Sequence, residues 1–545
     1  MRILAASISI AIVSGLAQTP PPSPAITLRD VASSSGITFR LENHPTPAKR
    51  LIETMPGGLA AFDYNNDGLA DLYFTNGASA TSGSAKPQAD WNRLYRNDGG
   101  FKFTDVTAQA GVAGEGFSMG AAAADFDNDG DVDLFVAGFE RNVLYRNTGK
   151  GTFENVTAQS GIHGRVWSVA AGWLDFDRDG LLDLFVVNYL KWSASGDRFC
   201  GDRTRDIRVY CHPKYYDGLP NTLYRNRGNG TFEDVSEKSG IARHIGKGMS
   251  LAFADYDADA WLDVFVTNDT LPNFLFRNLG NGRFEETALL AGAGVSINGK
   301  AISSMGVAFR DFDNDGRPDL HVTALAGETF PLFRNEGRGQ FSDQTAPSGL
   351  SRATQRRSGW GNAMADLDND GWKDLFTANS HVNDRVEDFE AHRYREANSL
   401  FRNAGNGKFV DISEQIGADF KTPRAHRGAI AVDLNNDGRL DFVTTSLSDR
   451  PEIWENATAG ANRWLAVRLI GSVNNRDGIG ARIQAGKQMQ TLSTADGYSS
   501  SVHAPVHFGL GTLQRVDSVE ITWPNGKKQV VKDVTTNQVV TIKEQ

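Results

Sequence analysis

Aspartates at a regular spacing are the residues of this chain best suited to chemistry. The segment DFDNDGDVD, from Asp125 to Asp133, places four of them at its first, third, fifth and ninth positions, directly before an apolar run. Carboxylates so close together repel one another, so a folded loop that gathers them needs a partner of opposite charge. Oxygens at alternate positions, with the main-chain carbonyl of Asp131, suit the flexible shell of Ca²⁺, and Gly130 permits the sharp turn. The segment therefore predicts a calcium-binding loop.

The loop differs from an EF-hand in its closing ligand. Its last acid falls at position nine, and no glutamate follows at position twelve. Short apolar runs bounded by turn residues flank it, whereas an EF-hand lies between two long helices. We therefore expect the loop at the tip of a β-hairpin.

The same spacing recurs along the chain. Asp, Asn and Gly are ordinary turn residues, so one copy alone is weak evidence, but seven copies all keep acids at positions one, five and nine. In the fourth copy Ala260 replaces the glycine, and a Cβ is strained in a left-handed turn, so we expect a weaker or differently shaped site there. The expected Ca²⁺ ligands, with position seven contributing its main-chain carbonyl, are Asp63, Asn65, Asp67, Leu69, Asp71; Asp125, Asp127, Asp129, Asp131, Asp133; Asp175, Asp177, Asp179, Leu181, Asp183; Asp255, Asp257, Asp259, Trp261, Asp263; Asp311, Asp313, Asp315, Arg317, Asp319; Asp366, Asp368, Asp370, Trp372, Asp374; and Asp433, Asn435, Asp437, Arg439, Asp441.

The elements around these loops predict an all-β fold. A second motif, LYRN or LFRN before a glycine-rich turn, follows the loops, as in LYRNTGKGTF from Leu144. The loops begin 50 to 80 residues apart, and several short strands per unit at this period indicate propeller blades. We expect a seven-bladed β-propeller over residues 26–460 and a small, β-sandwich-like domain over residues 461–545. The strand pattern LRDVASSSGI from Leu28 lies N-terminal to the first acidic loop. We therefore expect the N-terminal strand to complete the last blade.

The N-terminus and the cysteines indicate an oxidising compartment. Residues 1–17 combine a basic start, a short apolar stretch and small residues, which predicts a cleaved signal peptide rather than a membrane anchor, and residues 18–25 form a proline-rich linker. Cys200 and Cys211 are the only cysteines; a disulfide is favoured over two free thiols or a metal pair. A net charge of −10 argues against a nucleic-acid partner. We expect a secreted or periplasmic protein without a membrane span after cleavage.

The motifs together resemble a known family. The DxDxDGxxD loops with their LYRN partners are similar to FG-GAP or VCBS-type repeats of integrin-like propellers, and GIGAR, GYSSS, HFGLG and VDSVEITWPNGK near the C-terminus resemble the ASPIC and UnbV domain. The combination is similar to the cartilage acidic protein family over nearly the whole mature chain. This resemblance implies a secreted seven-bladed propeller with calcium in its hairpins, and it implies no catalytic residues.

Two classes of function fit these features. The first is a noncatalytic binding or adhesion module for a glycan or protein ligand. Four aromatic residues of the long segment between the third and fourth loops either stack on sugar rings or pack this segment against the propeller. They are Trp192, Tyr210, Tyr215 and Tyr216.

The alternative is a calcium-dependent lyase or hydrolase acting on polysaccharide. Its candidate acids and bases are His212, His381, His426 and Arg427, although a lone histidine near a strand end is more often a structural hydrogen bonder. Glu53 is expected either in the axial channel or in a solvated loop. The recurring arginines of the LYRN motif favour a structural role beside a carboxylate or carbonyl rather than anion binding. They are Arg146, Arg225, Arg277, Arg334 and Arg402.

Overall fold

The computed structural model describes residues 25–79, 86–196 and 198–545. The expected signal peptide, and the proline-rich linker up to residue 24, lie outside the described residues. Within the described part, no helix combines the length and apolarity needed to cross a bilayer.

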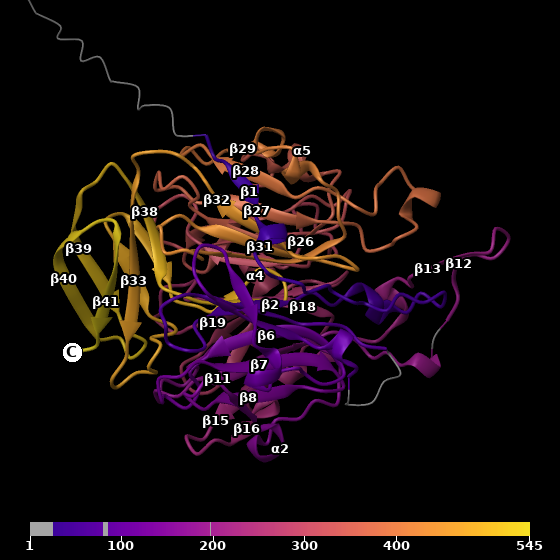
Figure 1. Cartoon of the computed structure of the whole chain (residues 1–545), viewed down its shortest axis with the longest axis horizontal. Coiled ribbons are helices and arrows are strands. Elements are labelled where there is room, and N and C mark those ends of the chain that lie inside the picture. Colours follow the sequence, from indigo (N-terminus) through magenta and orange to yellow (C-terminus); the bar gives the residue numbers. More distant parts are fainter. Residues whose placement is uncertain (1–24, 80–85, 197) are drawn as a thin grey trace, which may run out of the picture.

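Seven sheets share one antiparallel plan of four strands (Figure 1). Six of them are continuous in sequence apart from the insertion described below. They are β2 (Leu59–Phe62), β3 (Asp71–Phe74), β4 (Arg93–Asn97), β5 (Phe103–Asp105); β6 (Phe117–Ala124), β7 (Asp133–Phe139), β8 (Val143–Asn147), β9 (Phe153–Asn155); β10 (Ser168–Leu174), β11 (Asp183–Asn188), β15 (Thr222–Asn226), β16 (Phe232–Asp234); β18 (Gly248–Ala254), β19 (Asp263–Asn268), β20 (Phe274–Asn278), β21 (Phe284–Glu286); β22 (Val307–Arg310), β23 (Asp319–Val322), β24 (Leu332–Gly337), β25 (Gln340–Asp343); and β26 (Gly359–Ala365), β27 (Asp374–Asn379), β28 (Ser399–Asn403), β29 (Phe409–Asp411).

The remaining sheet of this plan joins the two ends of the repeat region. It contains β30 (His426–Val432), β31 (Asp441–Ser446) and β32 (Glu452–Asn456), and its outer strand is the N-terminal β1 (Leu28–Asp30), with Leu28 opposite Asn456. The prediction that the N-terminal strand completes the last sheet is confirmed. The inner strands β2, β6, β10, β18, β22, β26 and β30 each contact the next, and β30 contacts β2. The sheets therefore follow one another around an axis, and the all-β prediction is confirmed.

Small residues explain why the inner strands converge. β6 reads FSMGAAAA, and all eight of its residues are buried. Gly120 meets the main-chain oxygen of Val169 in the neighbouring β10, since a Cβ built on it would lie 2.4 Å from that atom. Larger apolar side chains on the next strand, such as Phe135 and Val136 of β7, fill the space between sheets. Close approach at the axis is thus a direct consequence of side-chain size.

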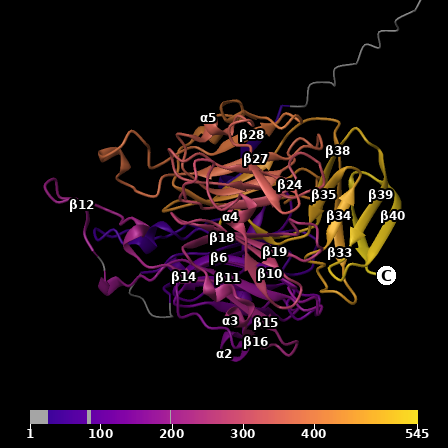
Figure 2. The same cartoon turned by 180° about the vertical axis from the view of Figure 1, so that it is seen from behind.

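Residues beyond the last repeat form two further sheets at one end of the molecule (Figures 1 and 2). Their apolar side chains, including Leu465 and Trp523, share one core with Phe126 and Trp173 of the repeat region. This C-terminal part therefore packs directly on the repeats. Its strands are β33 (Arg463–Ile470), β38 (Val506–Gly511) and β41 (Gln538–Lys543) in one sheet, and β34 (Arg482–Ala485), β35 (Gln488–Thr491), β39 (Arg515–Thr522) and β40 (Lys528–Thr535) in the other.

A segment of this C-terminal part enters the axis of the ring. β36 (Ala495–Asp496) and β37 (Ser500–His503) touch several inner strands, and β37 pairs in parallel with β2. Between them Tyr498 is fully buried and donates its hydroxyl to the main-chain oxygen of Met55 at 2.8 Å. We call residues 495–503 the axial plug. Its composition does not indicate this position, which was not among the predictions from the sequence.

The long insertion after β11 lies at the end of the molecule opposite the C-terminal sheets (Figures 1 and 2). It contains the hairpin of β12 (Cys200–Asp202) and β13 (Ile207–Val209), and a disulfide joins Cys200 to Cys211. This covalent link closes the hairpin at its base.

Candidate metal sites and the open face of the propeller

The last aspartate of each acidic loop anchors the loop to its sheet. Asp133 is fully buried; its Oδ2 accepts the main-chain N–H of Phe126 at 3.0 Å and its Oδ1 that of Asn147 at 2.7 Å. Asn147 is the asparagine of the LYRN motif, so one carboxylate joins two sequence motifs. The same pair of bonds recurs at Asp71, Asp183, Asp263, Asp319, Asp374 and Asp441.

The first aspartate shapes the turn itself. Asp125 accepts the N–H of Asp129 at 3.0 Å through Oδ1 and that of Gly130 at 2.7 Å through Oδ2. These bonds hold Asn128 and Gly130 at φ of 61° and 97°, in the left-handed region. Turning the chain twice in this way brings the side chains of positions one, three and nine toward a common point.

The resulting clusters fit a hard divalent cation. In five loops three aspartates offer carboxylate oxygens that all lie within 4.8 Å of one another, and these loops begin at Asp125, Asp175, Asp255, Asp311 and Asp366. The Oδ1 atoms of Asp127, Asp177 and Asp313, all at position three, are buried and lack a hydrogen-bond partner among the residues that the structure describes. Buried carboxylate oxygens without a donor are costly, and a bound cation would satisfy them. The other two loops carry Asn65 and Asn435 at this position.

Burial of the loop aspartates, and next the repulsion from neighbouring carboxylates, supports the same assignment. Burial, and next the neighbouring Asp477, raises the pKa of Asp125 to about 7, and burial together with Asp179 raises that of Asp175 to about 7. Negative charge is thus unfavourable in these loops without a counter-ion. A cation supplies the missing charge and reverses this penalty.

The fourth loop keeps the geometry of the others despite its alanine. Ala260 adopts φ of 74°, and its N–H donates to Asp255 Oδ2 at 3.0 Å, as Gly130 does in the second loop. The turn at Ala260 therefore matches that of the glycine-containing loops, and the expectation of a weaker or differently shaped metal site stays a prediction. The alanine imposes backbone strain, which for a residue with a Cβ in this region costs roughly 1–2 kcal/mol.

The recurring arginines lie beside these carboxylates, as expected for a structural role. Arg225 contacts Asp177 at 2.6 Å and Asp179 at 3.0 Å, and Arg334 contacts Asp313 at 2.5 Å. Arg277 and Arg402 pair in the same way, whereas Arg146 contacts Glu154. At position three, Arg225 pairs with Oδ2 of Asp177 and Arg334 with Oδ2 of Asp313. At Asp177 and Asp313 the other oxygen remains without a partner.

The asparagine of the LYRN motif joins neighbouring sheets, a role that the sequence analysis missed. Asn147 Nδ2 donates to Tyr64 O in the preceding loop at 2.9 Å and to Val132 O in its own loop at 3.1 Å. Asn97 donates to Leu434 O at 2.8 Å, which ties the first repeat to the last. Equivalent bonds to the preceding loop are made by Asn226, Asn278, Asn335, Asn403 and Asn456. Invariance of the asparagine in every copy was the available signal.

Asn147→Ala is expected to destabilise the chain by about 2 kcal/mol, because it leaves two buried carbonyl oxygens without a donor. Urea unfolding followed by tryptophan fluorescence measures the change. Asn298→Ala is the matched control, since Asn298 is exposed and its loss should cost within about 0.5 kcal/mol. Equal stability of the two variants would contradict a role for Asn147 in joining sheets.

The C-terminal sheets cover the face that carries the acidic loops. Asp477 accepts the N–H of Asp125 at 2.9 Å, and Asn462 donates to Asp368 O at 2.8 Å. The C-terminal His507 and Gly438 O of the seventh loop lie 3.1 Å apart. These contacts reach loops on opposite sides of the ring. The loop face is therefore largely occupied by the chain's own C-terminal part.

One contact of this interface completes a ring of loop-to-loop bonds. In six loops the side chain at position four donates to the main-chain oxygen at position six of the next loop, as Asn128 does to Gly180 O at 3.0 Å. Ala258 has no donor for Gly316 O in this series. The C-terminal Arg482 donates to that oxygen at 2.9 Å instead. The interface thus satisfies the acceptor that the fourth loop leaves open.

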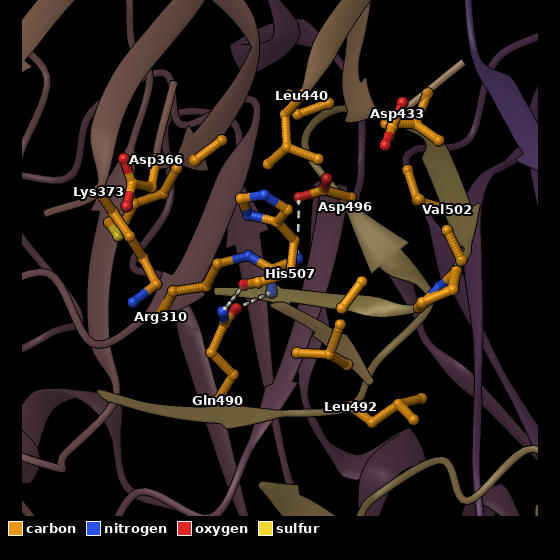
Figure 3. Close-up of a pocket in the computed structure, with 18 of the residues that line it drawn as sticks. Arg310, Asp366, Lys373, Asp433, Leu440, Gln490, Leu492, Asp496, Val502 and His507 are labelled. Atoms are coloured by element: carbon orange, nitrogen blue, oxygen red, sulfur yellow. Dashed lines mark hydrogen bonds and ion pairs between the residues drawn. The ribbon is translucent and has the colours of Figure 1, made fainter. Parts of the chain in front are cut away.

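A small cavity of about 110 Å³ remains between the C-terminal sheets and the loops (Figure 3). Arg310 donates to Gln490 at 3.3 Å and lies 3.8 Å from Asp496 of the axial plug. Lys373, which is buried, donates to the main-chain oxygen of Asp311 at 2.9 Å. Arg310 and Lys373 thus pair with groups of the chain itself, and the cavity lies within the interface between the C-terminal sheets and the loops.

The opposite face carries a larger cavity of about 310 Å³. It brings together Tyr210 and His212 of the insertion with His381, all candidates from the sequence, although His381 lies far from the insertion in sequence. Methionines and Trp360 line its floor, and the axial plug supports that floor: Tyr498 lies 5.1 Å from Trp360 between ring centroids. Asp269, held by the Tyr189 hydroxyl at 2.6 Å, was not predicted.

Both cavity histidines are held in one neutral form. His212 Nδ1 accepts the N–H of Lys214 at 3.0 Å, and His381 Nδ1 accepts that of Asn383 at 3.1 Å. Burial is the main cause that lowers the pKa of each ring. A neutral ring whose Nδ1 accepts a hydrogen bond carries its proton on Nε2. In this arrangement neither ring offers a free basic nitrogen, and each presents a donor.

The other sequence candidates have structural partners. His426 lies 3.1 Å from Glu452, and the Arg427 guanidinium lies 3.9 Å above the Trp360 ring and is fully buried. Glu53 is not solvated, because it is buried and its carboxylate accepts the Thr46 hydroxyl at 2.6 Å. The axial plug lies along the axis itself.

Glu452→Gln is expected to cost roughly 3 kcal/mol at pH 7, and the cost should fade in acid. Burial alone would raise the pKa of Glu452, but His426 and Arg424 lower it from 4.5 to about 2. A depressed pKa stabilises the fold fully above 4.5, and this contribution is lost as the pH falls toward 2. Urea unfolding of both chains at pH 7 and pH 3 measures the difference.

Glu414→Gln provides the control for this pair, because Glu414 forms an exposed ion pair with Lys421 at 2.7 Å. Such pairs contribute about 0–1 kcal/mol. A difference between Glu452→Gln and the parent chain that stays constant from pH 7 to pH 3 would contradict the assigned charge.

Sheets around an axis, with acidic loops at their hairpin tips, define an acidic-loop β-propeller with an added C-terminal β part. The family model of the FG-GAP-like repeat matches residues 63–136, 125–186, 201–266, 255–322 and 383–481. The family model of ASPIC and UnbV matches residues 471–545. The chain belongs to the FG-GAP-like repeat family and ends in an ASPIC and UnbV domain. The resemblance drawn from the motifs is confirmed.

Individual relatives are more distant. Cartilage acidic protein 1 of Mus musculus is 27% identical over 355 residues, covering 60% of this chain and 51% of the relative. The Homo sapiens protein of the same name is 26% identical over 340 residues, covering 60% and 48%. The chain spans about half the length of these curated relatives. Among solved structures, an Agrocybe aegerita lectin described as recognising non-reducing terminal N-acetylglucosamine aligns with a TM-score of 0.39 and 14% identity, over 72% of this chain and 87% of that one.

Proposed function

We propose that the chain is a secreted or periplasmic, seven-bladed propeller that binds Ca²⁺ in its acidic loops and serves as a noncatalytic binding module for a glycan or protein ligand. The propeller comprises residues 26–460 and the C-terminal domain residues 461–545, after a signal peptide over residues 1–17. One observation carries the metal assignment. At position three of several loops, a buried carboxylate oxygen has no hydrogen-bond partner among the described residues.

The ligand face in this proposal is the one opposite the acidic loops. The C-terminal domain occupies the loop face through Asp477, Asn462 and His507. The insertion face is open and carries the cavity of about 310 Å³, whose volume falls within the range of small-molecule sites. Its walls are held by the disulfide of Cys200 and Cys211, and Tyr210 is fixed by Glu53 at 3.3 Å. Fixed walls reduce the entropy lost on binding.

The protonation and hydrogen bonding of His212 and His381 favour binding without catalysis. A general base needs an unprotonated nitrogen directed at the substrate, and a general acid needs a proton that is readily released. The Nδ1 atoms of His212 and His381 are both engaged by main-chain N–H groups. Neutral Nε2–H groups serve as hydrogen-bond donors to a ligand.

The test is to incubate the chain with acidic and neutral polysaccharides, with Ca²⁺ or with EDTA, and to measure both retention and new chain ends. Elemental analysis of the same preparation determines its calcium content. Calcium in the protein and retention without cleavage are the expected results. New reducing or unsaturated ends would instead establish the alternative, a calcium-dependent hydrolase or lyase.

A further inference from the structure

The charged groups that line the cavity of about 310 Å³ on the open face are acidic. Two carboxylates, those of Asp269 and Glu390, lie among its lining residues, whereas none of the described residues that line it is a lysine or an arginine. Its two histidines, His212 and His381, are neutral, because burial lowers the pKa of each ring. The lining of this cavity therefore favours a ligand that carries positive charge.

The main chain fixes Asp269 in the cavity wall directly after β19. Its N–H donates to Lys247 O at 2.9 Å, and the N–H of the next residue, Thr270, donates to Ile302 O at 3.0 Å. Thr270 also lines the cavity, and its φ of 61° lies in the left-handed region, which is costly for a β-branched residue. Such a conformation persists only where the surrounding structure imposes it. Two neighbouring segments thus set the position of the carboxylate.

The negative charge of Asp269 is poorly balanced within the chain. Asp269 is 9% exposed, and its Oδ2 accepts the Tyr189 hydroxyl at 2.6 Å. Burial raises the pKa of Asp269 to about 6; the Tyr189 hydroxyl lowers it, and the neighbouring Glu328 carboxylate raises it. Lys247 lowers this pKa as well, but its ammonium group donates to Pro213 O at 2.8 Å. At pH 7 the carboxylate is therefore ionised in surroundings that a cationic ligand would improve.

The other lining groups indicate what carries that cation. The Nε2–H groups of His212 and His381 are donors, and the half-buried side chains of Leu325 and Val382 supply apolar contacts. A lysine side chain would bring an ammonium group but no acceptor for the two donors. An amino sugar brings an ammonium group, hydroxyl oxygens that accept hydrogen bonds, and a C–H face that packs on apolar side chains.

We propose that this cavity binds a hexosamine unit with a free amino group, as in an oligosaccharide of glucosamine. The ammonium group donates to the Asp269 carboxylate, and sugar hydroxyl oxygens accept the Nε2–H groups of His212 and His381. This inference rests on the proposed function as a binding module and adds the class of ligand and the residues that recognise it.

The experiment is isothermal titration of the full chain at pH 7 with the trisaccharide of glucosamine and with its fully N-acetylated form. Acetylation keeps the sugar rings and removes the positive charge, so the two probes isolate the charge. We expect the glucosamine trisaccharide to bind about tenfold more tightly or better, because a hydrogen bond between charged groups is lost on acetylation. Its affinity should fall as NaCl is raised.

Asp269→Asn tests the carboxylate, since it keeps the size of the side chain and an acceptor for the Tyr189 hydroxyl. It should weaken binding of the glucosamine trisaccharide about tenfold and remove the preference for this probe. Glu390→Gln, at an exposed residue, should weaken binding about threefold. Asp206→Asn is the matched control, because Asp206 is an exposed carboxylate of the insertion that does not line the cavity, and binding should be unchanged.

Three outcomes would overturn the inference: equal affinity for the two trisaccharides, unchanged affinity in Asp269→Asn, or binding of trilysine as tight as that of the glucosamine trisaccharide, which would assign the cavity to a peptide side chain. If Asp269→Asn fails to fold, Glu390→Gln and the two probes still decide the question.

Failure of this inference is distinguishable from failure of the proposed function. Retention on other polysaccharides by a chain that does not bind the glucosamine trisaccharide would contradict this inference alone. Binding of the trisaccharide by a chain that holds no calcium would support the inference and contradict the metal part of the proposed function.

Discussion

Chelation of calcium by excess EDTA is expected to lower the melting temperature by about 10 °C. Each site that binds the folded chain only, at a free calcium concentration one hundred times its Kd, contributes about 2.7 kcal/mol, and five such clusters are present. For a chain of 545 residues the entropy of unfolding converts their sum into a shift of this order. Differential scanning calorimetry in calcium and in EDTA measures it.

The control for chelation is a single altered loop. Asp175→Asn, which leaves the other clusters intact, should lower the melting temperature in calcium by only a few degrees, and the variant should lose about one bound calcium by elemental analysis. An identical melting curve in EDTA and in calcium, together with no calcium in the protein, would exclude the metal assignment.

Gly497→Ala is expected to cost about 5 kcal/mol, because the axial plug has no room for a side chain at this residue. A Cβ there would lie 2.7 Å from Asn362 O and 2.8 Å from Ala429 O, which belong to the inner strands β26 and β30. Gly497 also has φ of 58°, so alanine adds backbone strain of roughly 1–2 kcal/mol. Overpacking against fixed main chain accounts for the remainder.

Gly486→Ala separates strain from crowding. Gly486 has φ of 61°, but a Cβ there would meet nothing within 4 Å. It should therefore show the strain alone, about 1–2 kcal/mol. Urea unfolding of both variants gives the difference, and equal destabilisation would show that the plug does not fill the axis tightly.

The axial plug also links the two faces of the molecule. Its ends belong to the domain that covers the acidic loops, and Tyr498 at its tip holds Met55 and packs on Trp360, which line the cavity of about 310 Å³ on the open face.

The spacing of residues along the sequence was sufficient to predict the acidic loops, the all-β class and the family. All expected ligands of one loop lie within nine residues, so the position of Asp133 relative to Asp125 follows from the turn at Gly130 and needs no distant contact. Repetition then separated these loops from ordinary turns, because chance does not keep the acids in register. The same repetition marked Asn147 and its equivalents, but their partners are main-chain oxygens, which leave no trace in the residue types of the partner.

Long-range packing settled which face is open and what fills the axis. The pairing of β37 with β2 joins residues more than 400 positions apart, and GYSSS reads as an ordinary polar turn until the inner strands surround it. His212 and His381 meet because two separate loops rise from the same end of the ring, a relation set by blade geometry. Chemistry confined to one turn was therefore predictable, whereas chemistry assembled from several blades depended on how those blades close around the axis.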